Sequence, residues 1–380
     1  MAERATARID HGAIAANVSR LRAELRAGAG AGAELCVVVK AEAYGHGMVE
    51  VARTALDAGA GRLAVATAFE AERLASELPG ARLLTLGALR EEGFEVALGA
   101  GSEVAIWNEE TRAMAAARGR AMGRPAPVHV KLDSGMGRLG NMDPGEVIAL
   151  AAACAADPDL ELAGVWTHFA TADDRGDDYF EQQLERFTAV AEAVRAEHPG
   201  VCMHAANSAA VLRDPRTHFD LVRCGIAVYG LDPFGVDPGD WDLRPALSLH
   251  TYVATVKHFT AGTSAGYSRT WRAPRDTWVA ALPIGYGDGV RRSMSNNGEV
   301  LIAGARRPIV GNVSMDNITV DLGPETVVRP GDPAVLIGRQ GGEEITAEAV
   351  AARLGTINYE VTTAISARVA RQRAGNADAR

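Results

Sequence analysis

The sequence predicts an α/β protein in which an N-terminal (β/α)8 barrel of the TIM type precedes a mainly β domain. Eight short apolar runs occur at residues 35–39, 63–66, 83–86, 103–107, 127–132, 161–166, 201–204 and 219–222, with Ala-, Glu- and Arg-rich helical segments such as 48–58, 68–77, 144–156 and 179–196 between them. Alternation of this kind is typical of a parallel barrel. From residue 245 short period-two segments and Gly/Pro turns take over. We therefore expect a barrel over residues 1–244 and a mainly β domain over 245–380.

Composition narrows the functional classes. The chain has 380 residues, 47% of them hydrophobic, and a formal net charge of −9. That charge, without a dense Lys/Arg run, argues against nucleic-acid binding. No apolar run has the length of a membrane span or a signal peptide, so we expect a cytoplasmic protein without a membrane partner. The scattered cysteines, without a CxxC pair, favour buried free thiols over disulfides or a metal site.

The first elements can be placed from their patterns. Asp10 is positioned to cap a helix whose residues Ile14, Val18, Leu21 and Leu25 share one face. The next apolar run is expected to be the first barrel strand. An open doubly wound sheet is the alternative, but no GxGxxG turn follows this run.

Lys40 stands directly after that run, where a buried strand gives way to a Gly-rich turn. A lone lysine at a strand end is most often a solvated charge. The other interpretation is a Schiff-base lysine, because an amine partly removed from water has a lowered pKa and becomes a nucleophile for an aldehyde.

Further polar residues follow the later strands, where a barrel carries its active groups. They are Lys131 with Asp133 and Arg138, then Trp166, Thr167 and His168, then Asn207 and Ser208, and finally Arg223 with Gly225 and Ile226. Loops after the last two strands of such barrels usually hold a phosphate. The pattern therefore predicts a site at the carboxyl ends of the strands.

The second domain is expected to contain strands at 247–257, 277–282, 299–303, 317–321 and 334–338. A short helix is expected after Thr346 and another near Tyr359.

The segment from Val38 to Gly47, Val-Val-Lys-Ala-Glu-Ala-Tyr-Gly-His-Gly, resembles the lysine segment of the alanine racemases, pyridoxal-phosphate (PLP) enzymes of fold type III. The resemblance extends over nearly the whole chain, through the segments 131–140, 204–210, 223–233, 264–271, 283–289, 311–317 and 357–360. One departure is Gly266-Tyr267-Ser268, where the family usually has Ser-Tyr-Gly.

The resemblance implies a set of cofactor-binding residues. Lys40 would bind PLP covalently and Tyr44 would reach its phosphate, together with Asn207, Ser208, Gly225, Ile226 and Tyr359. His168 would lie against the ring, and Arg138 would contact a cofactor oxygen and the substrate carboxylate. Lys131 corresponds to a lysine that can be carbamylated. Arg223 would bond the ring nitrogen, and because an arginine is a permanent donor, that nitrogen would stay unprotonated and negative charge would remain near Cα.

The resemblance also implies a two-base mechanism in a shared active site. Lys40 would act as the base on one face of the substrate and Tyr267 as the base on the other. A phenol with an ordinary pKa near 10 needs positive charge nearby for that role. Tyr286 would act as a gate, while the Met315 amide and Asp316 would approach the substrate from the second subunit of a head-to-tail homodimer. The implied reaction interconverts L- and D-alanine and supplies D-alanine for peptidoglycan.

Three alternatives remain open from the sequence. A racemase of serine or of broader scope is the nearest, and rates on alanine, serine and lysine would separate it. A decarboxylase of similar build usually has an acidic residue where this chain has Arg223. A PLP-binding regulatory protein would consist of the barrel alone and would not need Tyr267.

Overall fold

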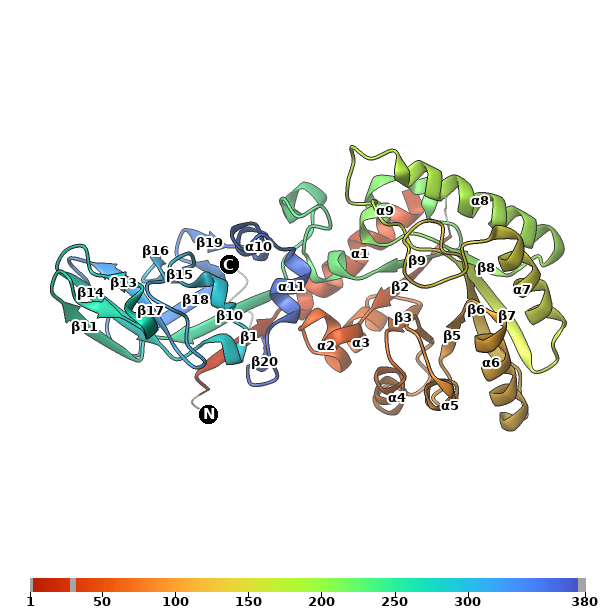
Figure 1. Cartoon of the computed structure of the whole chain (residues 1–380), viewed down its shortest axis with the longest axis horizontal. Helices are drawn as coiled ribbons and strands as arrows, with labels where there is room; N and C mark the ends of the chain where they lie inside the picture. The colour runs from red at the N-terminus through yellow and green to blue at the C-terminus, as the bar shows by residue number, and fades with distance from the viewer. Residues whose placement is uncertain (1–2, 28–31, 375–380) are drawn as a thin grey trace.

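The computed structural model describes residues 3–27 and 32–374 and has two parts, a barrel and a β-rich part. Figure 1 shows them side by side along the longest axis, with the barrel on the right. None of the helices in these two ranges has the length and apolar character needed to cross a membrane.

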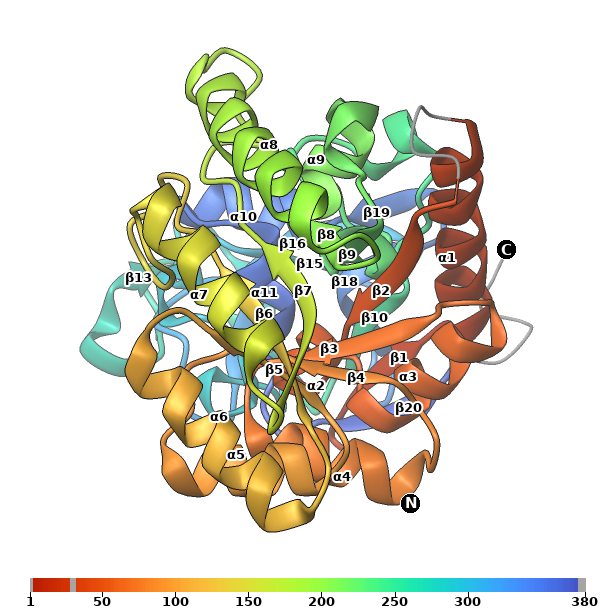
Figure 2. The same ribbon diagram turned by 90° about the vertical axis from the view of Figure 1, so that its right-hand side faces the viewer.

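The barrel is closed by eight parallel strands. They are β2 (Glu34–Val38), β3 (Arg62–Val65), β4 (Leu83–Thr85), β5 (Glu103–Ile106), β6 (Ala126–Lys131), β7 (Leu160–Trp166), β8 (Cys202–His204) and β9 (Leu221–Cys224). The parallel pairing of β2 with β9 completes the ring. Viewed from the barrel side, the strands are surrounded by helices (Figure 2).

Helices connect successive strands on the outside of the barrel. They are α2 (Lys40–Tyr44) and α3 (Met48–Asp57), then α4 (Ala68–Glu77), α5 (Glu91–Gly99), α6 (Glu109–Met122), α7 (Pro144–Ala156), α8 (Tyr179–Glu197) and α9 (Ser208–Arg213). Side-chain caps fix several starts, since Thr67, Asn108 and Asp143 each accept a backbone N–H of the first helical turn. Helix α1 (His11–Ala27) precedes the first barrel strand but contacts α3 and α9, so it fills the remaining place in the ring. Asp10 accepts the Ala13 N–H at 3.0 Å, as the sequence predicts.

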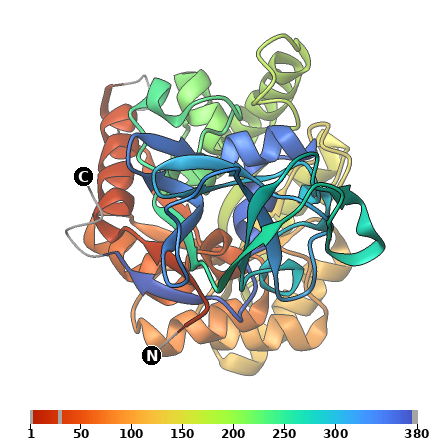
Figure 3. The same cartoon turned by 90° about the vertical axis from the view of Figure 1, so that its left-hand side faces the viewer.

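The β-rich part has one large sheet and two small ones. The large sheet has the order β16-β15-β18-β10-β1-β20, with β19 pairing to β18. Its strands are β1 (Ala5–Ile9), β10 (Leu247–Tyr252), β15 (Glu299–Ile302), β16 (Ala305–Pro308), β18 (Pro333–Gln340), β19 (Glu343–Ile345) and β20 (Ala370–Arg373). The small sheets are β11 (Thr255–Phe259), β14 (Thr277–Leu282) and β17 (Ile318–Gly323), and β12 (Ser264–Ala265) with β13 (Trp271–Arg272). Figure 3 shows these strands in front of the barrel.

Two helices link the parts. Helix α10 (Ala347–Leu354) begins after Thr346, whose hydroxyl accepts the Ala349 N–H, and α11 (Asn358–Thr363) carries Tyr359. Helix α11 packs against α2 at the carboxyl end of β2. The β-rich part therefore supplies side chains to the end of the barrel where the polar residues are expected.

The fold class and the eight barrel strands predicted from the sequence are confirmed, and so are the helices near Thr346 and Tyr359. The single strand expected over 247–257 is wrong, because backbone partners change in its middle. The Val253 N–H donates to the Asp332 carbonyl and the Ala254 N–H to the Ala281 carbonyl, so β10 and β11 enter different sheets. Strand β1 was not foreseen, and it pairs with β10 and β20 although it starts the chain.

Candidate functional site

A cavity of about 430 Å³ opens at the carboxyl ends of the barrel strands. Most of the side chains predicted for the site line it, together with apolar and small neighbours. The lining residues are Val38, Lys40, Tyr44, Ala66, Leu86, Gly87, Lys131, Arg138, Leu139, Trp166, His168, Asn207, Ser208, Arg223, Gly225, Ile226, Tyr359 and Thr363. Tyr359 and Thr363 come from α11. The cavity therefore joins the barrel and the β-rich part of the same chain.

Lys40 is held by an unusual turn. Residues Ala41, Glu42, Ala43 and Tyr44 all have positive φ, between 52° and 54°, and form a left-handed turn directly after the lysine. This conformation costs about 1–2 kcal/mol for each non-glycine residue. The Ala41 N–H donates to Glu70 Oε1 at 2.7 Å, which helps to hold the turn. Strain of this kind persists only where surrounding contacts fix it, and it is concentrated at functional sites.

Two lysines of the cavity have lowered pKa values. Burial, and then the positive charge of Arg138, lower the pKa of the Lys40 amine. Burial and the charges of Arg138 and Arg223 lower the pKa of Lys131 to about 8. The Lys131 Nζ lies 4.7 Å from the centre of the Trp166 ring, so an aromatic face takes the place of a carboxylate partner. Both amines therefore reach the neutral, nucleophilic form more readily than an exposed lysine.

Arg223 is fixed on the floor of the cavity and is 3% exposed. Its Nη1 donates to His204 Nδ1 at 2.8 Å, and its Nη2 donates to the carbonyls of Thr167 and Ala205 at 2.8 and 3.0 Å. The Nε–H has no partner among the described residues. A rigid guanidinium whose Nε–H is unused is therefore available to an acceptor in the cavity.

His168 lines the cavity beside Arg223, with its Nδ1 3.3 Å from Arg223 Nη2. Burial and the surrounding positive charges, Arg223 first, hold the pKa of His168 well below its ordinary value. The imidazole is therefore neutral at pH 7, and its Nδ1 accepts from the guanidinium.

Hydroxyl and backbone N–H groups gather at another part of the lining. Ser208 Oγ accepts the Gly225 N–H at 3.1 Å, so that amide is already used, whereas the Ile226 N–H has no partner among the described residues. Tyr44 packs beside Tyr359, with ring centres 6.0 Å apart. A Cβ at Gly225 would lie 2.8 Å from Tyr44 Cζ, so only glycine allows this approach. Several donors converging on one small space suit the oxygens of a phosphate.

The other predicted residues do not reach this cavity within one chain. Tyr267, Tyr286, Met315 and Asp316 belong to the β-rich part and are absent from the lining. Tyr267 is 71% exposed. Its carbonyl accepts from Asn312 Nδ2 at 2.8 Å, while Asp316 pairs with Arg368 at 2.6 Å.

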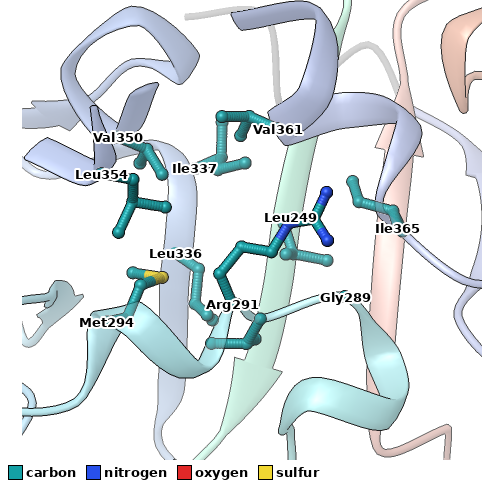
Figure 4. A pocket seen from close by; sticks show the side chains of 11 residues that line it. Leu249, Gly289, Arg291, Met294, Leu336, Ile337, Val350, Leu354, Val361 and Ile365 are labelled. Atoms are coloured by element: carbon teal, nitrogen blue, oxygen red, sulfur yellow. The ribbon is translucent and has the colours of Figure 1, made fainter. Parts of the chain in front are cut away.

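A second pocket, in the β-rich part, lacks comparable chemistry. Figure 4 shows it between aliphatic side chains that include Leu336, Val350 and Ile365, with Arg291 reaching into it. Arg291 is the one charged residue of this lining, and its Nη2 pairs with Glu360 at 2.8 Å. The barrel cavity is therefore the candidate site.

Sequence reasoning missed some residues that contribute to the barrel cavity. Leu86 and Gly87 line it from the end of β4, and their place at the end of the third apolar run was the available signal. Trp166 was noted only as a strand end, yet both Lys131 Nζ, at 4.7 Å, and Arg223 Cζ, at 4.8 Å, lie over its ring. No pattern in the sequence indicates that stacking.

Comparison with known proteins gives a consistent result. Residues 9–233 match the family model "Alanine racemase, N-terminal domain", and residues 246–373 match "Alanine racemase, C-terminal domain". An alanine racemase of Symbiobacterium thermophilum is 43% identical over 366 residues, which cover 96% of each chain. One from Geobacillus stearothermophilus is 42% identical over 376 residues, covering 96% of this chain and 92% of the relative.

Solved structures agree with the sequence matches. The alanine racemase of Streptomyces lavendulae has a TM-score of 0.93 at 37% identity and covers 99% of this chain and 98% of its own. The Bartonella henselae alanine racemase, described with covalently bound pyridoxal phosphate, has a TM-score of 0.86 at 28% identity, with 98% of this chain and 99% of its own covered. Two family models that together span nearly the whole chain, and close relatives of the same length, establish that this protein belongs to the alanine racemase family.

Proposed function

We propose that this protein interconverts L- and D-alanine with PLP bound in the barrel cavity. The observation that carries the proposal is the pairing, in one cavity, of a lysine with a lowered pKa and a buried arginine whose Nε–H is unused. A cavity of about 430 Å³ lies within the range of small-molecule sites. The Bartonella henselae relative, described with covalently bound pyridoxal phosphate, supports the choice of cofactor.

The residues of the cavity suit the parts of this cofactor. Lys40 would form the covalent bond to its aldehyde, and Tyr44, Asn207, Ser208, Gly225, Ile226 and Tyr359 would surround its phosphate. Arg223 would donate its Nε–H to the ring nitrogen, and His168 would lie against the ring. When bound, PLP supplies a conjugated ring that stabilises negative charge at the Cα of the amino acid.

The protein's own groups would then hold and move protons. Lys40, once released, would take or return the Cα proton on one face, and its lowered pKa makes the neutral base available. Arg223 would keep the ring nitrogen as an acceptor, because a guanidinium gives up no proton at pH 7. Arg138, on the cavity wall, would bind a carboxylate and place Cα beside Lys40.

The second base would come from a partner subunit. Tyr267 lies outside the cavity of its own chain and is largely exposed, which suits a residue that acts in another chain's site. We propose a head-to-tail homodimer in which the partner subunit's Tyr267, Tyr286, Met315 and Asp316 complete each cavity. Bulky rings at such a gate leave little space beyond a methyl side chain, which favours alanine over larger amino acids.

Lys131 would be carbamylated in this proposal. Its lowered pKa favours the neutral amine that adds to CO2 with release of a proton to solvent, and the resulting anion would face Arg138 and Arg223, two of the charges that lower that pKa. A carbamate there would hold Arg138 in place for the substrate carboxylate.

In the cell, the product D-alanine would feed peptidoglycan precursors, and the reaction would take place in the cytoplasm. The alternatives are less well supported. A barrel-only regulatory protein is not favoured, because family matches cover both parts of the chain, and a decarboxylase is not favoured, because the relatives are alanine racemases. Measured rates on alanine, serine and lysine would decide whether the protein is instead a racemase of serine or of broader scope.

The deciding experiment is proton NMR of L-alanine in D2O with purified protein and PLP, followed by chiral analysis of the same sample. Loss of the Cα proton together with D-alanine formation is the expected result. Exchange without inversion would show that one base works and that the role of Tyr267 is wrong. No exchange with alanine, but exchange with serine or lysine, would overturn the substrate assignment.

A further inference from the structure

A line of buried polar side chains runs through the interior of the barrel, away from the cavity. Arg223 Nη1 lies 2.8 Å from His204 Nδ1, His204 Nε2 lies 2.8 Å from His129 Nδ1, and His129 Nε2 lies 2.5 Å from Glu103 Oε2. Both histidines are 0% exposed. Barrel interiors are normally filled by branched apolar residues, so this polar line needs an explanation.

The line connects the two ends of the barrel. Glu103 is the first residue of β5, and Arg62, which also pairs with it, is the first residue of β3. His204 and Arg223 belong to β8 and β9, close to the cavity. A carboxylate at the amino ends of the strands is thereby joined to the arginine beneath the candidate cofactor site.

The chemistry of the two ends fixes the direction of every hydrogen bond. Arg223 has donors only, so His204 Nδ1 must accept and the proton of His204 must be on Nε2. That proton is donated to His129 Nδ1, so His129 carries its own proton on Nε2 and donates it to Glu103. The carboxylate has acceptors only and requires the same arrangement. Both histidines are therefore neutral and share the Nε2–H form.

The charges around the line agree with this arrangement. Burial, and then nearby positive charges beginning with Arg223, hold the pKa of His204 well below its ordinary value. Burial would raise the pKa of Glu103, but the hydrogen bond from His129 and the charges of Arg62 and Arg82 outweigh it and lower the value. Neutral histidines thus connect a lasting negative charge to a lasting positive one.

We propose that Glu103 and His129 are positioning residues for Arg223. They orient its guanidinium through His204 and supply a remote negative charge, although neither lines the cavity. Two backbone carbonyls already hold Nη2. The hydrogen-bonded line of Glu103, His129 and His204, called the relay below, therefore decides how Nη1 is held and how strongly the unused Nε–H donates. This inference rests on the proposed role of Arg223 at the cofactor.

Packing around the relay leaves little freedom for another arrangement. The Trp166 ring stacks on His204, with centres 5.5 Å apart and planes 2° from parallel. On β7, a Cβ at Gly164 would meet the His129 ring, with 2.7 Å to Cε1. The imidazoles are therefore fixed in rotation as well as in protonation.

The first test uses the full-length wild-type protein, with and without PLP, and records the tautomers of its histidines by nitrogen NMR. Two neutral Nε2–H histidines that take up no proton between about pH 5 and 9 are expected, since buried neutral histidines resist protonation. Their absence would overturn the proposal, and this readout requires neither a variant nor racemase activity.

The second test compares Glu103→Gln with Glu161→Gln. Glu161 is an exposed residue near the start of β7, so the control places the same change at the same end of the barrel. Glutamine can still accept from His129 but carries no charge. We expect Glu103→Gln to lower kcat about tenfold with little change in KM, similar to the effect of outer hydrogen-bond partners at metal sites, and to shift the nitrogen signals of both histidines.

The outcomes separate this proposal from the proposed function. A wild-type protein that neither binds PLP nor racemises alanine would refute the proposed function, while the histidine tautomers would still test the relay. A wild-type protein that racemises alanine, together with a Glu103→Gln variant whose kcat and histidine signals match those of Glu161→Gln, would refute the relay. If Glu103→Gln does not fold, Glu103→Asp keeps the charge and is expected to retain wild-type histidine tautomers.

Discussion

Replacing Gly225 by alanine tests the phosphate end of the proposed cofactor site. The added Cβ would lie 2.8 Å from Tyr44 Cζ and closer still to its hydroxyl, whereas ordinary contact begins at 3.4 Å. Tyr44 cannot easily move aside. It is buried, and its ring packs between Tyr229, with centres 5.0 Å apart, and Tyr359 at 6.0 Å.

The size of the effect follows from this overlap. Either Tyr44 or the backbone at Gly225 must shift by about 1 Å to relieve the contact with the hydroxyl, and overpacking of a tight site typically costs about 1–3 kcal/mol. If that cost falls on the arrangement that binds phosphate, the Kd for PLP rises by about 5- to 150-fold. Titration of cofactor-free protein with PLP, followed by absorbance, measures this change.

The matched control is Gly342→Ala. A Cβ there has no neighbour within 4 Å, so PLP binding is expected to match the wild type. Unfolding curves of both variants show whether the cost falls on stability instead. A Gly225→Ala variant that binds PLP as tightly as wild type, with unchanged stability, would refute the packing argument and the placement of the phosphate.

The remaining predictions concern subunit sharing, acid stability and carbamylation. Mixing Lys40→Ala with Tyr267→Ala subunits is expected to restore about a quarter of wild-type activity, because half of the re-formed dimers would pair the two variants and each of these would have one intact site out of two. No recovery after verified subunit exchange would mean that the sites are not shared. Burial lowers the pKa of His46 from 6.5 to about 4 in the folded protein, so the unfolded chain takes up its proton first as the pH falls. The contribution of this group to the free energy of unfolding is thus complete above pH 6.5 and is expected to fall by about 3 kcal/mol toward pH 4. Urea unfolding at several pH values should show this loss in the wild type and a smaller loss in His46→Gln. A wild-type stability that does not change with pH in this range would contradict the prediction. Mass spectrometry in bicarbonate should find one added CO2 on Lys131 and none on exposed Lys257, and the adduct on Lys131 should be lost on acidification. The same adduct in Lys131→Arg would place the modification elsewhere.

The sequence was sufficient to predict the barrel and most of its cavity. Each barrel strand is a short apolar run, because both faces of a parallel strand are buried, and such runs can be recognised locally. Once the strands are placed in order around a barrel, their carboxyl ends must share one face. Lys40, Lys131, His168, Ser208 and Arg223 could therefore be assigned to one site without coordinates, and all of them line the cavity.

Other features depend on contacts that no local pattern encodes. The period-two run from Leu247 looks continuous, yet its backbone hydrogen bonds pass from one sheet to another. Strand β1 joins β10 and β20 because a sheet edge can be completed by any segment that reaches it, however distant in the chain. The left-handed turn after Lys40 consists of ordinary residues, and only surrounding packing selects that conformation.

The sequence by itself thus determined the barrel and the end at which its polar residues gather, since periodicity and chain order carry that information. The tertiary structure decided that Tyr267 lies outside the cavity of its own chain and that Glu103, His129, His204 and Arg223 form one line of hydrogen bonds. The position of Tyr267 depends on how the β-rich part packs against the barrel, and the line of hydrogen bonds depends on strand register and tilt across the closed barrel. Those quantities are set by the packing of all eight strands together, and not by any one of them.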